Sequence, residues 1–146
     1  MVILSDYREK APFHFEGYEV ERTNLEVGDY SIQGLEKLIA VERKSLDDLT
    51  ACMGRDRERF VNELRRARSM RCFCVIIEGS FFDLQSGRYF SSIKSEQAVA
   101  SVMGWQSSFR IPFFFAGGRS EAEAATLAYL IQAEKVCRRM MQGKLI

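Results

Sequence analysis

Two neighbouring segments decide the fold of this chain: Val27-Gly28-Asp29-Tyr30 and Val41-Glu42-Arg43-Lys44-Ser45-Leu46-Asp47-Asp48. The apolar residues 38–41 predict a buried strand, which Glu42, Arg43 and Lys44 continue. Because successive side chains of a strand point to opposite faces, we expect Glu42 and Lys44 on one face and Arg43 on the other. A carboxylate and an ammonium are costly to bury at a strand end, so this pair indicates a metal ion and a charged substrate.

A second carboxylate, Asp29, stands in the strand predicted over residues 27–33. On its own, an aspartate after a glycine is typical of a turn. If the two strands pair as a hairpin, however, Asp29 reaches the same point in space as Glu42. Two carboxylates and a lysine then form a site for a hard cation, beside a group that transfers a proton or stabilises charge.

These residues also resemble a known family. Gly28-Asp29, then Glu42-Arg43-Lys44 with Asp48 after three intervening residues, resembles the GD…ERKxxxD motif of the XPF-type structure-specific endonucleases. Other matches to the family are looser, and they are Asp6-Tyr7-Arg8-Glu9, Arg59-Phe60 with Glu63-Leu64, Val75-Ile76-Ile77-Glu78-Gly79 and Ser120-Glu121-Ala122-Glu123. The chain departs from the family at residues 10–17, which include a proline and are too short for the helix found there in relatives.

The resemblance implies a restriction-endonuclease-like fold whose acidic residue and E-x-K motif bind divalent metal and cut DNA. The residues it assigns to catalysis are Asp29, Glu42, Arg43, Lys44 and Asp48. It further implies that Mg²⁺ or Mn²⁺ binds to Asp29 and Glu42, with Glu9 added to the acidic rim. An ordinary turn is the alternative interpretation of the segment that contains Glu9.

Two of these residues have structural interpretations as well. Arg43 faces away from Glu42, which favours a role in locking the strand by pairing with a nearby acid, although the family treats it as part of the active site. Asp48 follows Ser45, a candidate N-cap, and acidic residues are favoured in the first turn of a helix. Capping and function can coincide there.

Residues 55–71 predict an amphipathic helix, because Phe60, Val61, Leu64 and Ala67 recur at helical spacing. Its other face is rich in arginine, the residue suited to bidentate phosphate contacts. The candidates for DNA binding are Arg8, Arg55, Arg57, Arg59 and Arg66. A solvated charged face is the alternative interpretation.

The composition bounds the remaining possibilities. The chain has 146 residues, 47% of them hydrophobic, and a net charge of +1, so we expect one domain over residues 1–146 and no global polyelectrolyte attraction to nucleic acid. The four cysteines and one histidine lack zinc-site spacing. We find neither a bilayer-spanning apolar run nor a signal-peptide pattern, so we expect no membrane partner and an intracellular protein, in a nucleus or in the cytoplasm of a prokaryote or phage-infected cell.

The order of the predicted elements indicates an α/β fold, a single domain in which a central mixed sheet is flanked by helices. The strands expected besides the hairpin cover residues 1–5, 18–22, 72–78 and 111–115, and the later helices cover 95–109 and 120–141, with Ser95 and Ser120 as N-caps.

We therefore expect a metal-dependent endonuclease that cuts branched or structured DNA in repair or recombination. The alternative is a DNA-binding or assembly module with a vestigial nuclease site. Relatives often carry a helicase region or tandem helix-hairpin-helix domain, and neither fits in this chain. The expected partner is a second copy, through residues 95–109 and 120–141, or a subunit that bears such a region.

Overall fold

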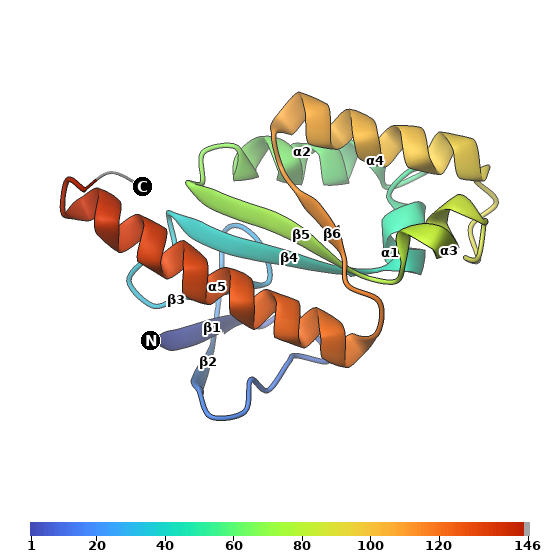
Figure 1. Ribbon diagram of the computed structural model, residues 1–146. Helices are drawn as coiled ribbons and strands as arrows, with labels where there is room; N and C mark the ends of the chain where they lie inside the picture. The colour runs from blue at the N-terminus through green and yellow to red at the C-terminus, as the bar shows by residue number, and fades with distance from the viewer. Residues whose placement is uncertain (145–146) are drawn as a thin grey trace.

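The strand that carries Glu42, Arg43 and Lys44 is β4 (Ile39–Ser45), and it lies inside a six-stranded mixed sheet (Figure 1). The computed structural model describes residues 1–144. The other strands are β1 (Val2–Asp6), β2 (Glu19–Thr23), β3 (Tyr30–Ile32), β5 (Cys72–Glu78) and β6 (Phe113–Phe115). Their order across the sheet is β2-β1-β3-β4-β5-β6, and β3 runs antiparallel to both of its neighbours while the other pairs are parallel. This is the α/β architecture that the sequence predicts.

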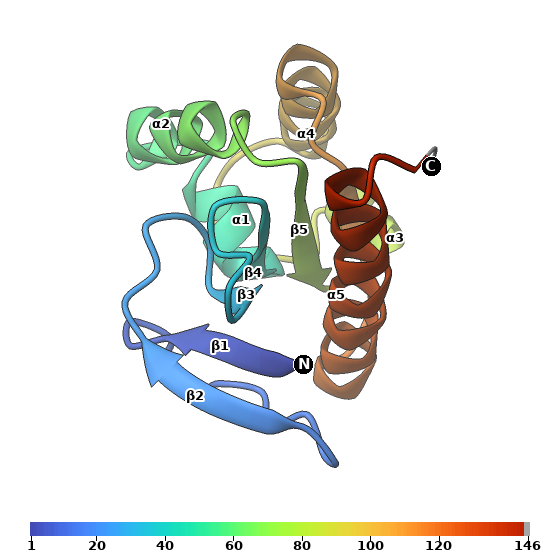
Figure 2. The same cartoon turned by 90° about the vertical axis from the view of Figure 1, so that its left-hand side faces the viewer.

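The helices cover both faces of this sheet. They are α1 (Leu46–Ala51), α2 (Arg57–Ala67), α3 (Phe81–Gln85), α4 (Ser95–Phe109) and α5 (Arg119–Met141). Figure 2 shows α2 and α4 on one side of β5 and the long helix α5 on the other. None of the helices within residues 1–144 combines the length and the apolarity that crossing a membrane requires.

The central strand β5 shows how the two faces are filled. Its residues alternate, so that Phe73, Val75 and Ile77 pack in the core under α2 and α4, while Cys74 and Ile76 pack in the core under α5. The same alternation along β4 places Glu42 and Lys44 on the α2 face and Arg43 on the α5 face, as the sequence predicts.

The segment 10–17 forms no helix, in agreement with its length and its proline. Phe13 and Phe15 are nevertheless buried, because both rings pack against Tyr30 of β3 at centroid distances of 5.3 and 5.4 Å. These contacts give the core under α5 apolar side chains that the short segment supplies without a helix.

Three sequence-based expectations differ from the structure. Strand β3 is shorter than residues 27–33, and Asp29 lies in the bend that precedes it. The N-caps are Lys94 for α4 and Gly118 for α5, one and two residues before the expected serines. Glu123 forms no capping box, because its carboxylate accepts a hydrogen bond from the Phe15 amide at 3.1 Å. A contact between segments 108 residues apart replaces the local one.

Candidate active site

The bend before β3 brings Asp29 against β4. Gly28 has a φ of +74°, and a Cβ there would lie 3.0 Å from both Ala40 Cβ and the Val41 carbonyl oxygen, so the close approach requires glycine. The Asp29 amide donates to the Val41 carbonyl at 2.8 Å, and the Arg43 amide donates to Asp29 Oδ2 at 2.8 Å. These contacts orient the Asp29 carboxylate along β4.

Asp29 and Glu42 line one cavity of about 140 Å³ on the α2 face. The reason lies in the register, which pairs Tyr30 with Val41 and, continued by one residue, sets Asp29 opposite Glu42. Opposite residues of antiparallel strands point to the same face. The predicted convergence of these two residues on one point of the sheet is therefore present in the fold. Glu26, Glu63, Arg8 and Arg66 complete the charged part of the lining.

Both carboxyl groups hold their protons more tightly than usual. Burial raises the pKa of Asp29 to about 6, although the hydrogen bond from the Arg43 amide acts in the other direction. Burial also raises the pKa of Glu42 well above its ordinary value, and the negative charge of Asp29 raises it further. Two carboxylates that repel each other in a desolvated cavity attract a cation.

Lys44 lies on the same face as Glu42, with its Nζ 3.4 Å from Glu42 Oε2 and 4.8 Å from the centre of the Phe60 ring. Burial acts to lower the pKa of Lys44, but the attraction of Glu42 outweighs burial and raises it. Lys44 is therefore a cation in this structure. The notebook of chemical roles for a lysine here narrows to charge stabilisation, since a strongly held proton makes it a poor base.

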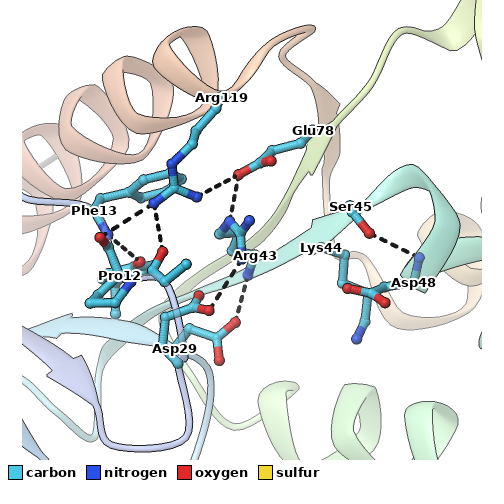
Figure 3. Close-up of polar contacts among 12 residues, drawn as sticks. Pro12, Phe13, Asp29, Arg43, Lys44, Ser45, Asp48, Glu78 and Arg119 are labelled. Atoms are coloured by element: carbon cyan, nitrogen blue, oxygen red, sulfur yellow. Dashed lines mark hydrogen bonds and ion pairs between the residues drawn. The ribbon is translucent and has the colours of Figure 1, made fainter.

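Arg43 faces α5 and joins a network of charges (Figure 3). Its Nη1 lies 3.1 Å from Glu9 Oε1, and its Nε lies 2.5 Å from Glu78 Oε1. Arg119 at the start of α5 adds a 3.5 Å ion pair to the same Glu78 oxygen and a 2.6 Å hydrogen bond to the Ala11 carbonyl. The expected pairing of Arg43 with nearby acids is confirmed, and it ties β4, β5 and α5 together.

Two further candidates lie near these residues but outside the cavity lining. Glu9, expected at the acidic rim, pairs with Arg43 on the α5 side. Burial raises the pKa of Glu9, while Arg43 and Arg119 act to lower it. The exposed Asp48 lies in the first turn of α1, and its amide donates to Ser45 Oγ at 3.0 Å, which confirms Ser45 as the N-cap.

The cavity suits a small divalent cation. Carboxylate oxygens are hard ligands, and Mg²⁺ is commonly held by one or two carboxylates while keeping several water molecules. Asp29 and Glu42 provide such a pair. Over residues 1–144, no group of three or more histidine, cysteine, aspartate or glutamate side chains is arranged to hold a metal ion. Two carboxylates with solvent and substrate oxygens therefore describe the coordination that these residues can support.

The arginines expected at DNA have different surroundings. Arg8 and Arg66 line the cavity, and Arg55 is exposed just before α2. The Arg57 guanidinium stacks over Trp105 and donates to Ser101 Oγ at 3.1 Å, so its contacts hold α2 against α4. Arg59 is exposed and lies 3.5 Å from Asp56.

Sequence reasoning missed two contributions to the site. Glu63 was interpreted as a surface acid, yet it lines the cavity. Its position three residues after Phe60 and one before Leu64 places it at the border of the apolar stripe, a signal that could have identified it. Arg119 gives no such signal, because its role depends on how α5 packs.

Comparison with known proteins places the chain among characterised domains. The family model described as the ERCC4 domain matches residues 3–130. A solved structure of XPF from Aeropyrum pernix superposes with a TM-score of 0.71 at 18% identity, covering 100% of this chain and 65% of that one. Another, described as XPF from Aeropyrum pernix in complex with DNA, has a TM-score of 0.63 at 19% identity and covers 99% of this chain and 67% of that one. No curated protein sequence matches significantly.

Proposed function

The chain belongs to the ERCC4 domain family, and from this premise we propose that it is a divalent-metal-dependent endonuclease acting on branched or structured DNA, in repair or recombination. One observation carries the proposal: Asp29 and Glu42 line a single cavity, with Lys44 on the same face of the sheet. Since the chain spans 65% of the length of the Aeropyrum pernix XPF structure, the activity and partners of a whole protein belong to the proposal too.

In this proposal Asp29 and Glu42 hold Mg²⁺ or Mn²⁺, which when bound lowers the pKa of a coordinated water and neutralises charge on the phosphate. The Arg43 amide keeps Asp29 in place through its hydrogen bond to Oδ2. Lys44, a cation beside Glu42, stabilises the negative charge that develops on the phosphate oxygens. Arg43 and Glu9 act from the opposite face by positioning β4.

The arginines of the cavity supply the first contacts with DNA. Arg8 and Arg66 line the cavity itself, so they are placed to meet phosphates beside the scissile one. Arg55 and Arg59, both exposed around the start of α2, extend this basic surface. Such contacts provide affinity that depends on salt and not on sequence.

The test is a cleavage assay on a panel of flap, fork, nicked and linear duplex DNAs with Mg²⁺ or Mn²⁺. We expect the wild type to cut branched DNA, Glu42→Gln to lose cleavage, and Glu26→Gln, a matched change in the same cavity lining, to retain it. Full cleavage by Glu42→Gln, or by the wild type in EDTA, would contradict the proposal.

The alternative, a DNA-binding module with a vestigial nuclease site, makes a different prediction for metal binding. Calorimetric titration of the wild type and Glu42→Gln with Mn²⁺ separates the two. Binding that the substitution weakens supports the nuclease. DNA binding with no Mn²⁺ binding supports the module.

A second copy of the chain is the partner we propose. An apolar hollow between β6 and α5 is lined by Ile76, Phe114, Ala125 and Tyr129, and Phe114 is 54% exposed. The proposed contact therefore uses α5, as the sequence indicated, together with β6 in place of α4. Light scattering of the wild type and Phe114→Glu tests it: we expect a dimer that the charge disrupts, and a wild type monomeric at high concentration would contradict it.

A further inference from the structure

A second hollow, of about 750 Å³, opens where the ends of α2 and α4 meet the start of β5. Three arginines lie in its lining, namely Arg68, Arg71 and Arg110. They come from three separate places in the chain: the C-cap of α2, the residue before β5 and the C-cap of α4. We call this hollow the arginine groove.

The arginine groove carries positive charge that nothing in it neutralises. Its lining includes no aspartate and no glutamate. In the part of the chain that the structure describes, Arg68, Arg71 and Arg110 form no ion pair, whereas Arg43 and Arg119 are paired with acids. The hydroxyls of Ser107 and Ser108 add neutral polar groups to the lining. A concave surface with cations and without anions is complementary to an anion.

Contacts with uncharged groups hold two of these guanidinium groups. Arg68 lies over the Phe109 ring at 6.0 Å, and Arg71 Nε lies 3.0 Å from Met140 Sδ. Such contacts restrict the side chains while leaving their charge available. Arg110 has a φ of +56°, a left-handed conformation in which a helix usually ends with glycine or asparagine. The chain therefore places an arginine where the backbone favours a smaller residue.

The arginine groove adjoins the catalytic cavity. Phe73 lines both hollows, and Arg66 in the cavity lies two residues from Arg68 in the groove. Phe73 pairs with Ala40, two residues before Glu42 on the neighbouring strand, so strand geometry puts its Cα about 8 Å from that of Glu42. A strand of B-form DNA advances about 3.4 Å per nucleotide. The groove thus begins about two to four nucleotides from a phosphate held at Glu42.

We propose that the arginine groove binds backbone phosphates of the substrate DNA, about two to four nucleotides to one side of the cleaved bond. This inference rests on the proposed function, since it assigns a binding subsite to the same reaction. The three cations are distributed around a hollow far larger than one phosphate group, which fits a run of phosphates better than a single small anion. The acidic cavity and the basic groove then divide the work between metal binding and DNA binding.

The first test compares two variants that remove equal charge. In the groove variant, Arg68, Arg71 and Arg110 become glutamine; in the control, Arg65, Lys135 and Arg138 become glutamine, all exposed and outside both hollows. Anisotropy of labelled duplex DNA in EDTA, over a series of salt concentrations, gives Kd. We expect Kd to rise about 10- to 100-fold in the groove variant, with a salt slope reduced by about 2 to 3. Equal effects in both variants would overturn the proposal.

Position is tested with DNA that carries single uncharged methylphosphonates. Substitution two to four nucleotides from the cleaved bond, on one side, should weaken binding by the wild type and leave the groove variant unaffected. If the same substitutions weaken both proteins equally, the groove does not contact those phosphates. A variant with lysine at all three positions should regain most of the affinity, and thermal unfolding of every variant shows that loss of fold is not the cause.

Two outcomes separate this proposal from others. If inorganic phosphate or a nucleoside triphosphate binds the wild type and loses binding in the groove variant while DNA affinity is unchanged, the groove is a small-anion site and the proposal fails. Cleavage is measured separately: the groove variant should raise KM and leave kcat within about twofold, because the groove lies outside the metal cavity. Groove-dependent DNA binding by a wild type that cuts no DNA would sink the proposed function and leave the groove standing.

Discussion

The backbone amide of Arg43 donates a hydrogen bond to Oδ2 of Asp29 at 2.8 Å. The bond joins a carboxylate in the bend before β3 to the middle of the E-x-K segment on β4. It leaves the Arg43 side chain free to pair on the opposite face, so one residue contributes to both sides of the sheet. Its backbone orients a candidate metal ligand, and its side chain fastens the strand.

The two cavity carboxylates should reduce the stability of the metal-free protein. Asp29→Asn keeps an oxygen that can accept from Arg43 while it removes a desolvated charge beside Glu42. We expect Asp29→Asn to raise the free energy of unfolding without metal by about 1–3 kcal/mol. Chemical denaturation in EDTA at pH 7.5 measures the change. With Glu26→Gln as control, a stability equal to or below the wild type would argue against the repulsion.

Gly28 should be far less replaceable than another glycine with a similar backbone. Gly28→Ala adds a Cβ 3.0 Å from Ala40 and Val41 at a φ of +74°, whereas Gly34→Ala meets nothing within 4 Å at a φ of +86°. We expect Gly34→Ala to cost about 1 kcal/mol and Gly28→Ala at least about 2 kcal/mol more. Urea denaturation compares them, and equal losses would show that close approach is unimportant at Gly28.

Arg43 should matter more to stability than Arg119. The side chains of Arg43, Glu9 and Glu78 are 16%, 9% and 16% exposed, so Arg43→Ala leaves two poorly solvated carboxylates unpaired, at a cost of about 3–5 kcal/mol. Arg119 is 44% exposed and its ion pair is longer, so we expect Arg119→Ala to cost about 1 kcal/mol. Equilibrium unfolding of both variants checks the order, and similar losses would mean that Arg43 does not lock the strand.

The buried Asp6 should make stability depend on acid. Burial acts to raise its pKa, but hydrogen bonds from Arg8 and the Leu25 amide outweigh burial and hold the pKa below 3.8. Because the folded carboxyl binds a proton more weakly than the unfolded one, its stabilisation is complete above that value and is lost as the pH falls through the folded pKa.

Asp6→Asn should therefore cost about 1–3 kcal/mol at pH 7 and progressively less below pH 4. Urea denaturation at pH 7 and pH 3 measures both differences, with the exposed Glu16→Gln as control. A gap between wild type and Asp6→Asn that stays constant over this range would show that the charge of Asp6 does not stabilise the fold.

Local patterns were enough to predict much of the site. Alternation along β4 predicts the opposite faces of Glu42 and Arg43, and the turn glycine before Asp29 indicates the hairpin partner. The cap residues of α4 and α5 were predicted wrongly, because a serine at a helix start is a weak signal where a neighbouring residue takes the extended cap conformation instead. Glu123 shows the same competition, since its carboxylate serves the Phe15 amide in place of its own helix.

The sequence by itself determined which residue types face each side of the sheet, because side-chain alternation and glycine conformations are properties of a few consecutive residues. Only the tertiary structure decided that Arg119 reaches Glu78, that Glu63 enters the cavity and that Arg68, Arg71 and Arg110 surround one groove. Those meetings depend on how α2, α4 and α5 pack across the sheet. Packing is settled by the whole core and has no counterpart in any short stretch of the chain.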